Sequence, residues 1–235
     1  MKYIILAAGM GTRLHPYTRN YPKSMLKLGN DKFVLQYTID CINKLDSNAQ
    51  IYTVVGFNQD FIREKIKGCE FIENPFYSVT NSIASLWFAK DLLVGPVTII
   101  NADVVFEEEL WQAIINKNDM SFVCLDSSIK QDGDYNVQVL GDKVVIMSKE
   151  LKEYFGEYCG VTKLNECDTA ILKDEILNMV NDGFYNEWYE NAVVQKILNN
   201  KMIVRYLDIK EYAWTELDTV NDLFLARKIT ENKDI

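Results

Sequence analysis

Glycines and basic residues near the start of the chain have the types and spacing of a phosphate-binding loop. Gly9 and Gly11 follow the apolar run 2–7, and Arg13 and Lys23 come shortly after them. Glycine adopts backbone angles closed to other residues and has no side chain, so such a loop can bring backbone N–H groups close to phosphates. The two bases would add positive charge. An ordinary strand-to-helix turn with two surface bases is the alternative.

Two aspartates far apart in the sequence are candidates for a divalent-cation site. Asp103 directly follows the apolar run VTIINA, and Asp218 lies in YAWTELDTVNDLFLA. The carboxyl ends of parallel strands open on the ligand crevice of an α/β sheet, which favours ligand binding by Asp103. Mg²⁺ is usually held by one or two carboxylates together with phosphate oxygens and water. The alternatives are a turn or cap role for Asp103 and capping of the last helix by Asp218, for which Thr219 competes.

The elements that would position these residues alternate in type along the chain. The strand-like runs are KYIILA, QIYTVVGF, CEFIE and VTIINAD. The segments of helical period are FVLQYTIDCINKL, QDFIREKI and TNSIASLWFAKDLL. This alternation predicts βα units that feed a doubly wound, mostly parallel mixed sheet, and therefore the α/β fold class.

The pattern changes after Met120, where strand-like runs follow one another between polar turns. These runs are SFVCL, NVQVL, KVVIMS and EYCGVTKL. They predict a small β-rich insertion or edge. Helical segments return at 169–180 and 187–198, followed by a strand at 202–209 and an amphipathic segment at 220–229.

The composition limits the classes of function. A chain of 235 residues with 48% apolar content can bury a large core without disulfides or metals. The net charge of −9 argues against broad binding to nucleic acid or anionic membranes. The five cysteines form no CxxC pair, and no apolar run approaches membrane-spanning length. We expect a cytoplasmic protein that is a monomer or homodimer and takes small-molecule substrates.

The full string around the glycines is more specific than the glycines alone. LAAGMGTRL, followed by Pro16, Thr18 and PKSML, resembles the signature of the nucleotidyltransferase family, which includes sugar-1-phosphate nucleotidyltransferases and phosphocholine cytidylyltransferases. The resemblance implies that the loop wraps a nucleoside triphosphate, while Arg13 and Lys23 hold phosphates. The implied nucleotide-binding residues of the loop are Leu6, Ala7, Ala8, Gly9, Gly11, Thr12 and Arg13.

Both aspartates also lie in stretches that resemble family motifs. TIINADVVF resembles the segment with the family's metal-binding aspartate, and WTELDT resembles its closing motif. The resemblance implies that Asp103 and Asp218 share a Mg²⁺ ion and form the catalytic set with Arg13 and Lys23. Because these motifs lie far apart, the resemblance to the family spans essentially the whole chain. Asn101 is a departure, because several relatives carry a second acid there.

Two stretches favour the cytidylyltransferase branch of the family. The chain lacks the GKP that follows PKPM in many sugar-specific members, and TNSIASL replaces their glycine-rich base-recognition stretch. TNSIASL resembles the corresponding segment of cytidylyltransferases that act on phosphocholine and similar phospho- or phosphono-compounds. CTP is therefore the expected nucleotide, with Asn81, Ser82 and Ser85 at its base. Helix capping and helix-face polarity are alternative roles for these three residues.

The expected acceptor pocket draws on FGEYCGVTKL, NEWYENAVVQKI and AWTELD, which also resemble this branch. The cation of an aminoalcohol acceptor would bind over Trp or Tyr rings near a carboxylate. An uncharged polyol phosphate or sugar phosphate could stack on the same rings. Inward packing of the aromatics is the alternative. The expected acceptor-binding residues are Lys23, Tyr158, Trp188, Tyr189, Glu190, Trp214 and Glu216.

Together these features predict a Mg²⁺-dependent cytidylyltransferase that moves CMP from CTP to a small phosphorylated acceptor and releases pyrophosphate. Residues 1–118 would form the nucleotide-binding half and residues 119–235 the acceptor-binding half of one domain. The attacking oxygen is already anionic, so positioning and charge suffice and the single histidine, His15, is expected to play no part. The alternatives are a sugar-1-phosphate nucleotidyltransferase using UTP, dTTP or CTP, and a non-catalytic nucleotide-binding regulator.

Overall fold

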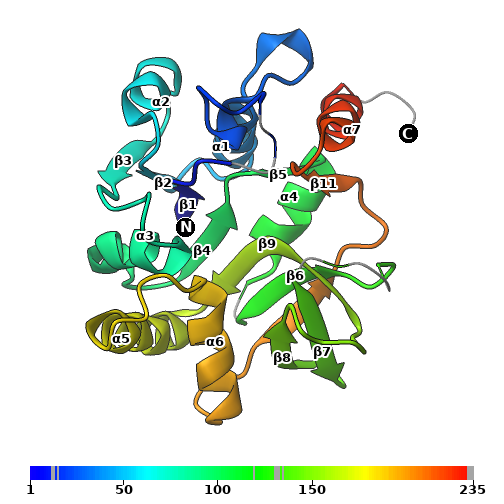
Figure 1. The fold of residues 1–235 in the computed structure, drawn as a ribbon. Coiled ribbons are helices and arrows are strands. Elements are labelled where there is room, and N and C mark those ends of the chain that lie inside the picture. Colours follow the sequence, from blue (N-terminus) through cyan, green and yellow to red (C-terminus); the bar gives the residue numbers. More distant parts are fainter. Residues whose placement is uncertain (12–13, 15, 119, 130–132, 134, 232–235) are drawn as a thin grey trace.

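A nine-stranded mixed sheet forms the centre of the computed structural model, which describes residues 1–11, 14, 16–118, 120–129, 133 and 135–231 (Figure 1). Its strands are β1 (Lys2–Ala7), β2 (Gln50–Val55), β3 (Glu70–Glu73), β4 (Val97–Asn101), β6 (Phe122–Asp126), β7 (Asn136–Leu140), β8 (Lys143–Ser148), β9 (Gly156–Leu164) and β10 (Arg205–Asp208). They lie in the order β3–β2–β1–β4–β9–β6–β10–β8–β7.

Most strands of this sheet point the same way. β1 pairs in parallel with β2 and β4, β2 with β3, and β6 with β10. β9 is inserted antiparallel between β4 and β6, and β8 runs antiparallel to β10 and β7. The prediction of a doubly wound, mostly parallel mixed sheet is confirmed.

Strands of the second half of the chain close on themselves. β7 pairs with β8 and also with β9, so β9, β6, β10, β8 and β7 form a ring of hydrogen-bonded strands. The expected β-rich insertion or edge corresponds to the β7–β8 hairpin. β6 and β9 instead lie in the interior of the sheet, and β9 lies directly beside β4, the strand that precedes Asp103.

Helices cover both faces of the sheet (Figure 1). They are α1 (Val34–Leu45), α2 (Gln59–Lys65), α3 (Ser82–Phe88), α4 (Glu108–Asn116), α5 (Glu166–Asn181), α6 (Tyr189–Leu198) and α7 (Val220–Thr230). Residues of α1, α2 and α4 share one buried cluster with the sheet, and residues of α3, α5 and α6 share the other. None of the described helices is both long enough and apolar enough to cross a membrane.

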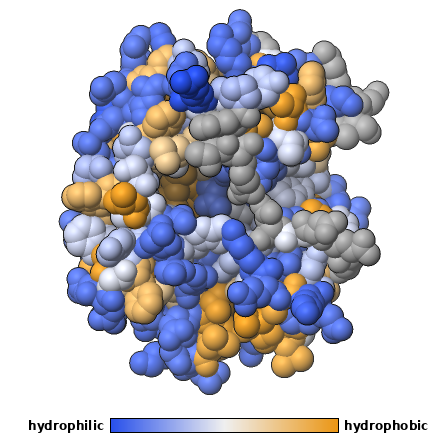
Figure 2. All heavy atoms as spheres, in the orientation of Figure 1, coloured by the Kyte–Doolittle hydropathy of each residue, from blue (hydrophilic) through white to orange (hydrophobic). Residues whose placement is uncertain are grey.

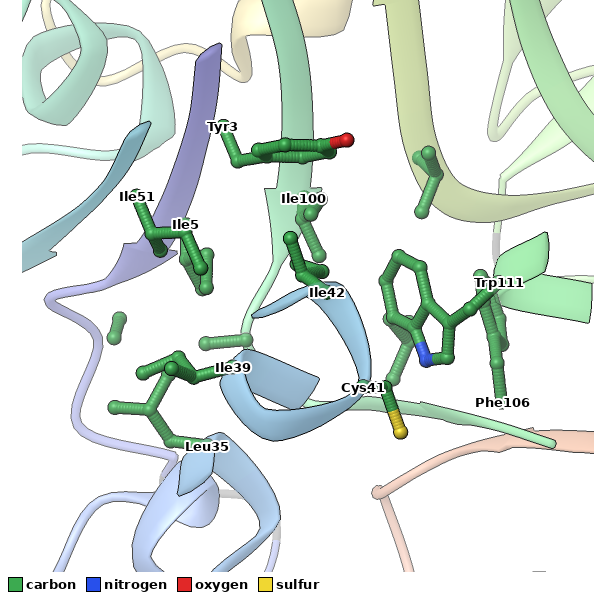
Figure 3. Packing of buried hydrophobic residues seen from close by; sticks show 14 of the residues in the cluster. Tyr3, Ile5, Leu35, Ile39, Cys41, Ile42, Ile51, Ile100, Phe106 and Trp111 are labelled. Carbon is green, nitrogen blue, oxygen red and sulfur yellow. The ribbon is translucent and has the colours of Figure 1, made fainter. Parts of the chain in front are cut away.

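The larger core cluster shows why β1 is a rigid base for the loop that follows it. Tyr3 and Ile5 point to the side of α1, where they meet Ile39 and Ile42, while Ile4 belongs to the opposite cluster (Figure 3). Fully burying one such isoleucine stabilises a fold by about 1.5–3 kcal/mol. The strand is thus anchored on both faces up to the residue where the glycine loop begins.

A second, two-stranded sheet connects the two ends of the chain. β5 (Val104–Phe106) pairs antiparallel with β11 (Trp214–Glu216), so that Val104 lies opposite Glu216. α7 packs against this pair through Ala226 and Ile229. The pairing carries the C-terminal segment to the carboxyl end of β4, where the expected metal-binding residues meet.

Candidate active site

Lys23 lies between the carboxylates of Asp103 and Asp218. Its Nζ is 3.5 Å from Oδ2 of Asp103 and forms an ion pair with Oδ1 of Asp218. The lysine side chain is 9% exposed, while those of the two aspartates are 26% and 22% exposed. Three predicted catalytic residues from distant parts of the sequence therefore converge, with the carboxylates still open to solvent.

Backbone pairing fixes the two aspartates relative to each other. Asp103 lies in the turn between β4 and β5, and its carbonyl accepts a hydrogen bond from the backbone N–H of Leu217 at 3.0 Å. Thr219 caps α7, because its Oγ1 accepts from the N–H of Asp222 and the Asp222 carboxylate accepts from the N–H of Thr219. Helix capping by Asp218, the alternative role, is therefore wrong, and its carboxylate is directed to Lys23.

A cavity of about 290 Å³ adjoins the lysine and the glycine loop. Its lining residues are Leu6, Ala7, Gly9, Gly11, Pro22, Lys23, Ser24, Asn81, Ala102 and Asp103. A Cβ added to Gly9 would meet no atom within 4 Å, so this glycine leaves space that a ligand can fill. Gly11 has φ +62°, and a Cβ there would lie 2.6 Å from Cγ of Lys23, so this glycine lets the lysine pack closely. Thr12, Arg13 and His15 lie outside the described residues.

A second cavity, of about 230 Å³, continues from the first and shares Leu6, Gly9, Asn81 and Asp103 with it. Its other lining residues are Ala8, Asn74, Tyr77, Thr80, Ser82, Ser85, Asn101, Tyr135, Tyr158, Trp188, Glu190 and Glu216. Figure 2 shows the molecule hollowed near the centre of this view, with hydrophilic residues inside the hollow. Asp103 thus stands where the two cavities meet.

Polar residues at the start of α3 line this cavity and also hold the local structure. The Asn81 side chain caps α3 by accepting from the N–H of Ser82 at 2.8 Å. Ser85 Oγ accepts from the side-chain amide of Asn74 at 3.0 Å. The predicted ligand role and the alternative capping role of Asn81 are therefore compatible, because the amide lies at the rim of the cavity.

Aromatic rings form the opposite wall of the second cavity. The ring of Tyr135 lies 5.1 Å from that of Trp188 and 6.0 Å from that of Tyr158, measured between centroids. Glu190, on the first turn of α6, is 4% exposed, and its Oε2 has no hydrogen-bond partner among the residues that the structure describes. The wall therefore combines aromatic faces with an incompletely satisfied carboxyl group.

The environment of Glu190 makes its ionisation unusual. Burial raises the pKa of its carboxyl to about 7, and the negative charge of Asp103 adds to this effect. Hydrogen bonds from its own backbone N–H and from the Asn101 side chain, together with the positive charge of Lys149, oppose the rise. A ligand that supplied a positive charge would favour the ionised form.

Comparison with known proteins assigns the chain. Residues 2–129 match the family model described as Nucleotidyl transferase, which is more than half of the chain. The chain belongs to this family. It is 26% identical to the choline-phosphate cytidylyltransferase of Streptococcus pneumoniae over 243 residues that cover 100% of both chains. It is 26% identical to the CTP:phosphoglutamine cytidylyltransferase of Campylobacter jejuni, covering 95% of this chain and 98% of that protein.

A solved structure of the CTP:phosphocholine cytidylyltransferase from Streptococcus pneumoniae superposes with a TM-score of 0.79 at 25% identity. The match covers 97% of this chain and 98% of the other. The protein is therefore a nucleotidyltransferase enzyme of cytidylyltransferase-like type. The glycine loop and the closing motif predicted the family, and TNSIASL predicted the cytidylyltransferase branch.

Two expected acceptor residues of the nucleotidyltransferase lie elsewhere. Tyr189 is fully buried and does not line the cavity; its hydroxyl bonds to those of Tyr158, at 2.7 Å, and Thr162, at 3.1 Å. The indole N–H of Trp214 donates to Asp126 at 2.8 Å, and Trp214 lines another pocket together with Glu216 and Asp218. Tyr189 therefore follows the alternative of inward packing, whereas the Trp214 side chain is held by a hydrogen bond that the sequence did not predict.

The second cavity of the nucleotidyltransferase is also lined by residues that the sequence did not single out as ligand-binding. Asn74, Tyr77, Thr80 and Tyr135 line the second cavity. Thr80 is a turn residue whose Oγ1 donates to the Phe76 carbonyl at 2.8 Å, and Asn74 follows β3 at the carboxyl end of a parallel strand. That position was the available signal for Asn74, because strand ends of this kind face the ligand crevice.

The carboxylates of Asp103 and Asp218 suit a magnesium ion that takes its other ligands from substrate and water. They do not suit a metal ion that is held by protein ligands alone. Among the described residues, no group of three or more His, Cys, Asp and Glu side chains could hold a metal ion. Asp103 and Asp218 instead form a pair of oxygen donors around one cationic group. Mg²⁺ commonly uses one or two carboxylates and takes its remaining ligands from substrate phosphates and water, so the pair fits this ion.

Proposed function

We propose that this nucleotidyltransferase moves CMP from CTP to a small phosphorylated acceptor bearing a cationic group, and releases pyrophosphate. The observation that carries the proposal is the position of Lys23 between Asp103 and Asp218. Lys23 lines the cavity of the glycine loop, and Asp103 lines both cavities. A single domain with one continuous crevice could then hold the triphosphate in the cavity of the glycine loop and the acceptor against the aromatic wall.

Lys23 would act on the phosphates directly. Its ammonium lines the cavity of the glycine loop, and its aliphatic stem packs on Gly11, so the charge has a defined position. A preorganised cation stabilises negative charge that develops in the transition state without having to reorganise. The acceptor's phosphate oxygen is already anionic, so in-line positioning requires no general base.

Asp103 and Asp218 are the residues that would hold Mg²⁺. When bound, the ion would neutralise the triphosphate and the leaving pyrophosphate. The chain's own part is to keep the two carboxylates oriented through the β5–β11 pairing and to balance them with Lys23. Arg13 is proposed to add a further charge on the triphosphate.

The choice of CTP rests on the two full-length relatives, whose names both denote cytidylyltransferases. The side-chain amide of Asn81 and the hydroxyl group of Ser85 line the second cavity and offer hydrogen-bond donors for a pyrimidine base. The cationic acceptor rests on the wall of Tyr135 and Trp188 beside the buried carboxyl of Glu190, a combination that attracts ammonium groups.

The test is pyrophosphate release by the purified protein with Mg²⁺. Each of the four nucleoside triphosphates is combined with phosphocholine, phosphoethanolamine, glycerol 3-phosphate or glucose 1-phosphate. We expect release with CTP and an amine-bearing acceptor, and none after chelation of the metal or in Asp103→Asn. Pyrophosphate release with glucose 1-phosphate only would show that the acceptor is a sugar phosphate and not a phosphorylated amine. No release with any combination in the presence of Mg²⁺ would contradict the proposed reaction.

A further inference from the structure

An ammonium group of the chain itself lies on the aromatic wall of the acceptor cavity. Nζ of Lys149 is 3.5 Å from the centroid of the Trp188 ring. A cation within about 6 Å of a Trp ring centroid is attracted by the ring quadrupole. Lys149 directly follows β8 and is exposed, and within the described part of the chain Trp188 is the partner that holds its ammonium.

The same charge also reaches the carboxyl group of the cavity. Burial raises the pKa of Glu190, and the positive charge of Lys149 is one of the effects that oppose this rise. Lys149 is not among the residues that line the cavity, so its ammonium influences Trp188 and Glu190 without filling the space between them. A cationic ligand entering that space would therefore meet the ring and the carboxyl group with a like charge already beside them.

We infer that Lys149 is a specificity residue that weakens the binding of bare cations in the acceptor cavity. Its ammonium takes up part of the attraction of the Trp188 ring and repels a second cation near Glu190. An acceptor that carries a phosphate as well can still bind, because the adjoining cavity presents Lys23 to that phosphate. The residue thus favours phosphorylated amines over the corresponding free amines, which would occupy the site without reacting.

This inference rests on the proposed function only in taking the second cavity for the acceptor site. Its test therefore measures binding separately from turnover. The probes are choline chloride, phosphocholine and glycerol 3-phosphate, each titrated calorimetrically into the protein without nucleotide or metal. Lys149→Met removes the charge and keeps the length of the side chain, whereas Lys149→Arg keeps the charge. Lys152→Met is the matched control, because Lys152 is an exposed lysine on the same segment.

We expect Lys149→Met to bind choline about two- to fivefold more tightly than the unaltered protein, because one exposed like charge on the ring is removed. The affinity for glycerol 3-phosphate should stay the same or fall, and phosphocholine should gain less than choline. Lys149→Arg and Lys152→Met should behave as the unaltered protein does. The ratio of the affinity for phosphocholine to the affinity for choline should therefore fall only in Lys149→Met. Circular dichroism is the check that this variant is folded.

Equal or weaker choline binding by folded Lys149→Met would overturn the inference, and so would an equal gain in Lys152→Met. Absence of choline binding in all variants would overturn it as well, because the cavity would then take no cation. Failure of the proposed function gives a different result: pyrophosphate release would be absent with every acceptor, while the effect of Lys149→Met on choline binding would persist.

Discussion

The hydroxyl oxygen of Ser82 accepts a hydrogen bond from the backbone N–H of Tyr189 at 2.9 Å, across 107 positions of sequence. Tyr189 is the first residue of α6, and the preceding Trp188 supplies no side-chain cap. Two backbone hydrogen bonds also join residues 81–83 to residues 185–187. The start of α3, on the proposed nucleotide side of the cavity, therefore holds the start of α6, on the proposed acceptor side.

Replacing Ser82 with Ala should affect the acceptor more than the nucleotide. The change leaves an N–H at the start of α6 without its partner, and losing an N-cap costs about 0.5–2 kcal/mol. Because α6 carries Glu190, we expect the KM for the acceptor to rise several-fold while the KM for CTP changes little. Steady-state kinetics with each substrate varied in turn measure this difference. Ser82→Thr keeps the hydroxyl group, so its KM for the acceptor should stay close to that of the unaltered protein. Equal increases in both KM values of Ser82→Ala would contradict this role.

The two glycines of the loop should respond differently to alanine. A Cβ at Gly9 meets no protein atom, so Gly9→Ala should keep the thermal stability of the protein but raise the KM for the triphosphate. An alanine at position 11 would have to keep the unfavourable positive φ of Gly11, and its Cβ would approach Cγ of Lys23. Gly11→Ala should therefore lower the melting temperature as well. Calorimetry on the two variants measures the cost of backbone strain, and kinetics measure the loss of space for the triphosphate. A large loss of stability in Gly9→Ala would show that the free space is not needed for ligand alone.

Removing Lys23 should make the protein's melting temperature depend more strongly on Mg²⁺ at the proposed metal site. In Lys23→Met the carboxylates of Asp103 and Asp218 lose the cation between them, so added Mg²⁺ should raise the melting temperature more than it does in the unaltered protein. The value of kcat/KM should fall by roughly 10²–10³, as is typical when a group that stabilises transition-state charge is lost. Asp103→Asn should remove the magnesium response. The same magnesium response in Asp103→Asn as in the unaltered protein would place the metal elsewhere.

Glu190 should make the stability of the ligand-free protein depend on pH. Its pKa is about 7 in the folded chain, against an ordinary value of 4.5, so the folded state holds the proton more tightly. The resulting stability is fully present below pH 4.5 and is lost as the pH rises to about 7, with a total change of roughly 3 kcal/mol. Glu190→Gln cannot lose this contribution. Urea unfolding of both proteins at pH 5 and pH 8 measures the difference, and parallel pH dependences would contradict the assignment.

Much of the fold was predictable because each element of the first half has its own periodicity. Apolar runs such as Lys2–Ala7 became parallel strands, and the helical spacing of Ile39 and Ile42 matched the buried side of α1. α4 was missed although Leu110, Trp111 and Ile114 follow helical spacing. β5 and β11 each have three residues, too few for any periodicity, and they form because the two segments meet in the folded chain.

The candidate site divides in the same way. Asp103, Asp218 and Lys23 were predictable from local motifs, because each motif fixes one side chain at the end of a strand or loop. Trp188 and Tyr189 are neighbours in the sequence, yet only the first lines the cavity. Which of the two turns inward depends on the packing of α6 against the sheet, which the sequence pattern does not encode. Lys149 had no sequence signal, since its partner Trp188 lies on a different element.

The pairing of β5 with β11 joins a strand from the middle of the chain to one that follows every strand of the large sheet. All strands of the large sheet lie before residue 209, whereas Asp218 follows β11. Synthesis therefore completes every strand of the large sheet before it reaches the second carboxylate. A protease that cut between β10 and β11 would likewise leave a largely folded body without the carboxylate pair.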